Sequence, residues 1–310
     1  YVPPQGTLRV SNYHIWYINN MTRTSQALGP AKGKPASQRI FKTLGPKASH
    51  LVAELTERNR SIFSIRDVRT ISRLKPGPAR SFMAKLVGRG IATRLKPGLF
   101  VLVPFEFGHV RQFIGNPYAV AHELAGGRHY YLSHATAMDI HKMLTQPQHT
   151  IYVTTLRTIP RQQVAGIDFR FPRISKSRFF GTTSHWADPT HSVVTSDIER
   201  TVIDGLKDPD YCGGILEVAK GLWMRRNEVD LKRLVEYALR LDIGAVVRRL
   251  GFLLELWQLS APIEIDRLRR RLTNTYVPLD PSLPSAGKFQ RRWRLRLNLT
   301  PKELQAAVAT

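Results

Sequence analysis

The sequence predicts an α+β protein, with an N-terminal winged helix-turn-helix domain followed by a mixed α/β domain whose second half is helical. Three observations support this fold class. Residues 64–104 read as helix, turn, helix and a two-stranded ribbon. Short apolar segments typical of strands alternate with helical patterns over residues 130–206, and helical spacing dominates from Gly214 to Arg271. At 310 residues the chain is long enough for two domains, each with its own core.

We expect three segments: a flexible basic arm over residues 1–45, the winged domain over 46–104, and the mixed α/β domain over 105–310. The arm is rich in Ser, Thr, Gly, Pro and Lys after residue 21. The chain begins at Tyr1, and residues 1–20 carry no secretory signal pattern. Met21 is therefore the expected translation start.

The winged domain should begin with a helix after Pro46, because Leu51, Val52 and Leu55 share one helical face. Ile62 and Phe63 then predict a short strand. Ser64 followed three residues later by Asp67 resembles a capping box, which marks the start of a second helix.

A break over Ser72–Gly77 separates this helix from the next, and Pro78 suits the first turn of the new helix. The apolar positions of the new helix recur at helical spacing and should pack inward: Ala79, Phe82, Met83 and Leu86. The outward positions are then Arg80, Ser81, Ala84 and Lys85, and Gly88 and Gly90 end the helix. This helix is the expected major-groove recognition helix.

The wing should be a hairpin of Ile91–Leu95 and Leu99–Val103, joined by Lys96-Pro97-Gly98. Arg94 and Lys96 would lie on it, near a phosphate or the minor groove. The candidate DNA-binding residues are Lys75, Arg80, Ser81, Lys85, Arg89, Arg94 and Lys96.

The charge distribution favours a polyanionic partner. The formal net charge is +24, and residues 1–104 hold 18 Lys and Arg against 3 Asp and Glu. Such a concentration of like charge destabilises a compact domain unless a polyanion offsets it. Double-stranded DNA is the expected partner, while ribosome association and general basicity are the alternatives.

The second domain should contain strands at 130–132, 151–153, 167–171 and 191–194, with Ser133 capping a helix that runs to His141. Ser196 and Glu199 suggest a capping box for a helix over 198–206. Further helices are expected around 231–238 and 246–259, followed by a loop over 277–288 and a strand over 293–297 with a basic face. The apolar 246–259 helix is either domain core or a docking surface.

Nothing in the sequence favours catalysis or a cofactor. The single Cys212 excludes an internal disulfide and fits a reducing cytoplasm. His185, Asp188 and His191 lack the spacing of a metal site, and no Gly-rich phosphate loop is present. No apolar run reaches the roughly 18 residues that a membrane span needs. We expect a soluble cytoplasmic protein with no metal, cofactor or catalytic residue.

Four segments together resemble the AbiEi family of antitoxins. They are the wing GIATRLKPGLFVL, then YYLSHATAMDIH, then SDIERTVIDGL at 196–206, and RRLGFLLE at 248–255. The resemblance covers about residues 50–300. It implies an antitoxin of a type IV, abortive-infection toxin–antitoxin system that binds repeats in its own promoter through the winged domain. It also implies a C-terminal domain that counteracts a nucleotidyltransferase-like toxin, with no catalysis by the antitoxin itself.

On this interpretation, copies bound to neighbouring repeats would cooperate, and whether they dimerise in solution stays open. Two alternatives remain. One is a nuclease targeted by the winged domain, which would need clustered carboxylates to hold a metal. The other is a transcription regulator whose C-terminal domain senses a ligand.

Overall fold

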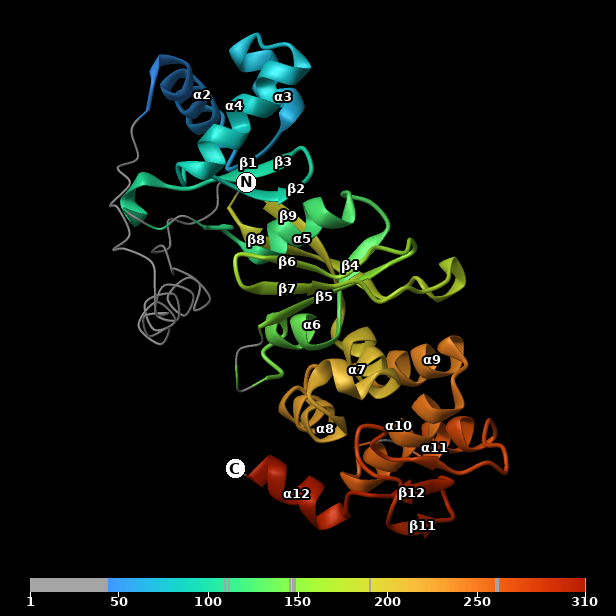
Figure 1. Cartoon of the computed structure of the whole chain (residues 1–310). Helices are drawn as coiled ribbons and strands as arrows, with labels where there is room; N and C mark the ends of the chain where they lie inside the picture. Colours follow the sequence, from blue (N-terminus) through green and yellow to red (C-terminus); the bar gives the residue numbers. More distant parts are fainter. Residues whose placement is uncertain are drawn as a thin grey trace.

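The computed structural model describes residues 44–309, except 109, 111, 145, 147, 148, 190, 260 and 261. The expected basic arm therefore lies almost wholly outside the described residues. Figure 1 shows an elongated molecule with the winged module at one end, a sheet in the middle and a helical half at the other end. No helix of the described residues is long and apolar enough to cross a membrane.

The winged module has the predicted order of elements: α2 (Pro46–Glu57), β1 (Ile62–Ser64), α3 (Ile65–Ser72), α4 (Pro76–Gly88), β2 (Ala92–Lys96) and β3 (Leu99–Leu102). The three strands form an antiparallel sheet in the order β1-β3-β2. Its core contains the apolar faces predicted for the helices, with Leu51, Val68 and Met83 all buried. The predicted winged helix-turn-helix is confirmed at the level of its fold.

Local signals explain where the two central helices begin and end. Ser64 and Asp67 form a complete capping box, in which the Ser64 hydroxyl accepts from the Asp67 N–H and the Asp67 carboxylate accepts from the Ser64 N–H. Arg73 adopts a left-handed conformation and ends α3. α4 begins at Pro76, two residues earlier than the expected first turn at Pro78, because proline also suits the first helical position.

The middle of the molecule is a six-stranded mixed sheet in the order β6-β7-β5-β4-β9-β8. Its strands are β4 (Tyr130–Leu132), β5 (Thr150–Thr155), β6 (Gln162–Val164), β7 (Ile167–Arg170), β8 (Thr182–Asp188) and β9 (His191–Ser196). Helix α5 (Pro117–Ala125) covers the face toward the winged module, and α6 (His134–Ile140) lies on the other side (Figure 1). Short 3-10 turns occur at Phe105–Phe107, Lys176–Arg178 and Pro209–Cys212.

Besides the core of the winged module, a second hydrophobic core is shared between one side of the wing and the sheet. Leu95, Leu99 and Val101 of the wing pack with residues of α5 and the sheet, including Val120 and Val153. The wing is therefore packed firmly onto the middle of the molecule.

The helical half contains α7 (Ile198–Lys207), α8 (Ile215–Met224), α9 (Leu231–Leu241), α10 (Gly244–Leu256), α11 (Pro262–Arg269) and α12 (Pro301–Ala309). A small sheet accompanies them in the order β10-β12-β11, made of Val277–Pro278, Leu295–Leu297 and Lys288–Gln290. The predicted strand at 293–297 is thus shorter, because Trp293 lies in the turn before it.

Two expected helix caps, one at α7 and one at α6, need correction. Asp197, not Ser196, caps α7, because its carboxylate accepts from the Arg200 N–H at 2.7 Å. Glu199 caps a different helix, since its carboxylate accepts from the Asp230 N–H at the start of α9. Ser133 occupies the N-cap position of α6 without a side-chain capping bond.

The apolar helix α10 is domain core and not a docking surface. Residues 246–254 are all buried. Even Arg249 is 3 % exposed, and its guanidinium donates to the carbonyls of Leu206 and Pro278. Since carbonyls at the end of α7 lack partners within their own helix, the buried guanidinium satisfies one of them.

Candidate nucleic-acid interface

Helix α4 presents the outward face that its apolar spacing predicts. Ala79, Met83 and Leu86 are buried, while Arg80 and Lys85 are exposed on the opposite side. Ser81 and Ala84 are also exposed. Because both residues are small, the backbone of this face can approach another surface closely.

A groove of about 580 Å³ runs between α4 and the wing. Arg80 lines it from the helix, and Arg94 lines it from β2. The remaining lining is mostly apolar, and Gly98 forms the tight turn of the wing with a φ of +78°. The fold thus brings Arg80 and Arg94 to the same groove from segments 14 residues apart in the sequence.

The other candidate residues extend this face along α4. Lys75 is the exposed N-cap residue of the helix, and Arg89 is its exposed C-cap residue. Ser81 and Lys85 are one turn apart on the helix, on the side of the exposed face away from the groove. Five cations are therefore spread over α4 and the wing: Lys75, Arg80, Lys85, Arg89 and Arg94.

Lys96 differs from the expectation. Its ammonium donates to the carbonyl oxygen of Glu123 at 2.6 Å, near the end of α5. Burial lowers the pKa of Lys96, and the nearby Arg157 lowers it further, while Glu123 opposes both. Arg157 also donates to the Ala125 carbonyl. Lys96 is therefore engaged in joining the wing to α5, which leaves its ammonium less available to a DNA phosphate than the exposed cations of α4 and the wing.

Three further cations, on α3 and at its C-cap, were not predicted from the sequence. Arg66, Arg69 and Arg73 are all exposed and recur at three- and four-residue spacing. Arg73 also lines a second groove, between α2 and α3, together with Lys47 and Arg58. The spacing of these arginines in the sequence is the signal that could have indicated them.

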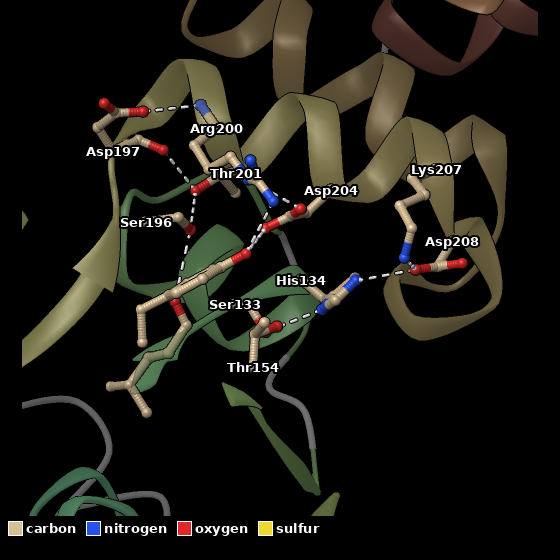
Figure 2. Close-up of polar contacts among 12 residues, drawn as sticks. Ser133, His134, Thr154, Ser196, Asp197, Arg200, Thr201, Asp204, Lys207 and Asp208 are labelled. Carbon is tan, nitrogen blue, oxygen red and sulfur yellow. Dashed lines mark hydrogen bonds and ion pairs between the residues drawn. The ribbon is translucent and has the colours of Figure 1, made fainter. Parts of the chain in front are cut away.

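A cluster of buried polar residues joins the sheet to α7 (Figure 2). Arg200 is fully buried, with its guanidinium bonded to Asp204 at 3.0 Å and to the Tyr131 hydroxyl at 3.0 Å. Burial, and then the charge of Asp204, raise the pKa of Tyr131 well above its usual value. This phenol consequently stays protonated and serves as a hydrogen-bond donor to Asp204.

Part of the same cluster has the composition of a catalytic triad but not its accessibility. The Ser133 hydroxyl lies 2.9 Å from His134 Nδ1, and His134 Nε2 lies 3.6 Å from the Asp208 carboxylate. Ser133 and His134 are 0 % and 2 % exposed, so a substrate cannot reach the hydroxyl. The Ser133 hydroxyl also accepts from Thr154, which ties α6 to β5. The arrangement acts as a structural connection between the two elements.

The residues considered as metal ligands, and the single thiol, have structural roles in the fold. Asp188 and His191 bond each other at 2.9 Å across the β8–β9 hairpin. Over the described residues, no group of three or more His, Cys, Asp or Glu side chains could hold a metal ion. Burial, and then nearby Asp204 and Asp208, raise the pKa of Cys212 well above its usual value, which keeps the thiol protonated.

Comparison with known proteins finds the fold but no family. No family model and no curated protein matches the sequence. Among solved structures, the chain is similar to the crystal structure of the RV2827C protein from Mycobacterium tuberculosis, with a TM-score of 0.67 and 13 % identity. The match covers 89 % of this chain and 99 % of that chain. The two proteins therefore share an architecture over nearly their whole length.

Proposed function

We propose that the protein binds double-stranded DNA through α4 and the wing and represses transcription from its own promoter. One observation carries this proposal: Arg80 and Arg94 face one groove from the second helix of a helix-turn-helix and from the adjoining hairpin, and both are exposed. A helix of this kind enters the major groove, and a neighbouring wing reaches the backbone or the minor groove. Arg80 can donate two hydrogen bonds to a guanine edge.

The remaining cations of this end supply affinity without base preference. Lys75, Lys85 and Arg89 lie along α4, and Arg66 and Arg69 lie on α3. Each phosphate contact releases counterions, so the affinity should fall steeply as salt rises. The small residues Ser81 and Ala84 would let the helix lie close to the base edges.

We further infer, from the resemblance of four segments to the AbiEi family, that the protein is an antitoxin. Its partner would be a nucleotidyltransferase-like toxin, and the sheet and helical half would counteract that toxin. The chain would itself have no catalytic activity. Copies bound at neighbouring promoter repeats would cooperate.

Fluorescence anisotropy with labelled promoter DNA tests the DNA-binding part. Arg80→Ala should weaken binding to the promoter about tenfold or more, because losing a bidentate base contact costs about 1–3 kcal/mol. It should also reduce the preference for promoter over scrambled DNA. Arg178→Ala, at an exposed arginine of the middle region, is the matched control and should leave binding unchanged. Equal losses on promoter and scrambled DNA would contradict a reading role for Arg80.

Co-expression tests the antitoxin part separately. If the reading frame next to the gene encodes a growth-arresting nucleotidyltransferase-like protein, this chain should restore growth. The doubly substituted chain Arg80→Ala, Arg94→Ala should still restore growth while losing repression. Failure of the unaltered chain to restore growth would contradict the antitoxin proposal and leave the DNA-binding proposal standing.

A further inference from the structure

The small sheet at the end of the molecule farthest from α4 is firmly anchored (Figure 1). The Trp293 ring is fully buried against Gly251 of α10, where any Cβ would overlap it. The Trp293 indole N–H donates to Glu255 at 2.7 Å, and Arg292 also donates to Glu255. Burial alone would raise the pKa of Glu255, but these bonds outweigh it and hold the pKa below its ordinary value.

The pairing inside this sheet is equally constrained. Gly287 precedes β11 with a φ of +97°, and a Cβ there would overlap the Leu297 carbonyl of β12. Only glycine fits this approach. The sheet is therefore a rigid platform on the helical half.

Two aromatic rings and two guanidinium groups meet on this platform. Phe289 pairs with Arg296 across β11 and β12, and the Arg296 guanidinium lies 5.4 Å from the Phe289 ring centre. Arg294 lies 5.7 Å from the ring centre of Tyr276, and the two rings contact edge to face at 5.0 Å. We call these four residues, Tyr276, Phe289, Arg294 and Arg296, the C-terminal aromatic–cationic face.

The positive charge of this face is not neutralised by carboxylates. Within the described part of the chain, neither Arg294 nor Arg296 has an ion pair, and their hydrogen bonds go to the hydroxyls of Tyr276 and Ser285. The positive charge of Arg294 also acts on the neighbouring Arg248. Burial lowers the pKa of Arg248, and repulsion from Arg294 lowers it further. An anion bound here would meet two cations with no competing carboxylate.

The aromatic component indicates which anion fits. Phe289 is 61 % exposed although its ring is apolar, so much of this side chain is open to solvent. A nucleic-acid base can stack on an exposed ring while adjacent guanidiniums contact its phosphates. Bases within a duplex are already stacked, whereas those of a single strand are free to stack on protein. An acidic protein segment would pair with the two arginines but would place nothing on the exposed Phe289 ring.

We propose that the C-terminal aromatic–cationic face binds single-stranded nucleic acid, with a base stacked on Phe289 and phosphates contacting Arg294 and Arg296. This site is separate from the duplex-binding face on α4, because Figure 1 shows the two at opposite ends of the molecule. The inference goes beyond the proposed function and does not depend on it.

The test uses the full chain carrying Arg80→Ala and Arg94→Ala, so that binding at the winged end is weakened. Fluorescence anisotropy then measures binding of labelled oligouridine RNA, oligothymidine DNA and a DNA duplex, each about 12 nucleotides long, within the range that such sites cover. The two single strands should bind more tightly than the duplex. The RNA and DNA arms decide which single strand is preferred.

Substitutions then locate the site. Phe289→Ala should weaken single-strand binding about tenfold, whereas Phe289→Tyr keeps the ring and should bind as before. Trp186→Ala removes another exposed aromatic ring, on β8, and should have no effect. Arg294→Gln with Arg296→Gln should lower the slope of log affinity against log salt by about 1.4, since each lost phosphate contact contributes about 0.7 for single strands.

Three results would overturn the proposal. One is duplex binding as tight as single-strand binding. Another is an affinity unchanged by Phe289→Ala. The third is binding of labelled polyglutamate without binding of either single strand, which would assign the face to an acidic protein. Circular dichroism of each variant verifies folding. If Phe289→Ala unfolds, the chain with Arg294→Gln and Arg296→Gln keeps the test decisive, because an unchanged salt slope would also overturn the proposal.

Discussion

At the scale of single residues, Lys96 joins the wing to α5. Its ammonium donates to the last turn of a helix, where carbonyls lack partners and a positive charge is favourable. Helical spacing and hairpin signals were enough to predict that Arg80 and Arg94 are exposed. They could not predict the orientation of Lys96, because its partner lies 27 residues away in a helix with no matching signal in the wing.

Lys96→Met should lower the free energy of unfolding by about 1 kcal/mol, because it removes charge-assisted hydrogen bonds while keeping the apolar stem. Urea denaturation measures this loss. Promoter affinity of the folded variant should stay within about twofold of the unaltered chain. A tenfold loss of affinity with unchanged stability would show instead that Lys96 contacts DNA.

Asp208 predicts how stability depends on pH. Burial alone would raise its pKa, but the His134 ring and the Lys207 ammonium, 2.6 Å away, outweigh burial and lower the pKa to about 2. Because the pKa in the folded state lies below the unfolded value near 3.8, the stabilisation exists above about pH 4 and disappears as the pH falls toward 2.

Urea denaturation of the unaltered chain and of Asp208→Asn measures this contribution. The difference between their unfolding free energies should be largest at pH 5–7 and should shrink steadily below about pH 4. A difference that stays constant down to pH 2.5 would mean that the charge of Asp208 does not stabilise the fold.

At the scale of elements, the sequence was informative where a signal was local. The Ser64–Asp67 capping box, the Gly88 helix end and the apolar stripes of α9 and α10 each lie within a few residues, and each predicted its element. The capping signal at Ser196–Glu199 was ambiguous, because Asp197 can also cap. Whether Glu199 belongs to the cap of α7 depends on α9, since Glu199 caps that helix from 31 residues away.

Gly251 is a local feature whose role only the packing reveals. Gly251→Ala should destabilise the protein by about 1–3 kcal/mol, because the added methyl overlaps the buried Trp293 ring. Gly88→Ala is the matched control at another helical glycine, where a Cβ meets nothing within 4 Å, and it should be neutral or slightly stabilising. Thermal unfolding of both variants gives the comparison, and equal melting temperatures would contradict this packing role.

At the scale of the whole molecule, the fold class and the order of its two parts followed from the sequence. The mixed strand order β6-β7-β5-β4-β9-β8 did not, because β4 pairs in parallel with β9 across more than 60 residues. The buried Arg200–Asp204–Tyr131 cluster was equally hidden, since charged residues in a helix usually face water. The candidate DNA-binding face could be predicted because it lies within one short module.

The shared core beneath the wing has a consequence for how copies of this protein would assemble on a promoter. Since the wing packs into the same core as α5 and the sheet, the molecule should project from the duplex at one fixed angle. Repeats one helical turn apart, about 10.5 base pairs, would orient two copies toward the same side, where they can touch.

Inserting about five base pairs between two repeats should then abolish cooperative binding, and inserting about ten should restore part of it. Electrophoretic mobility shifts on the three promoters measure the cooperativity. If the five-pair insertion leaves it unaffected, the sheet and helical half must rotate freely relative to the wing. The spacing of repeats along the operator would then be set by the rigid connection between the wing and the rest of the protein.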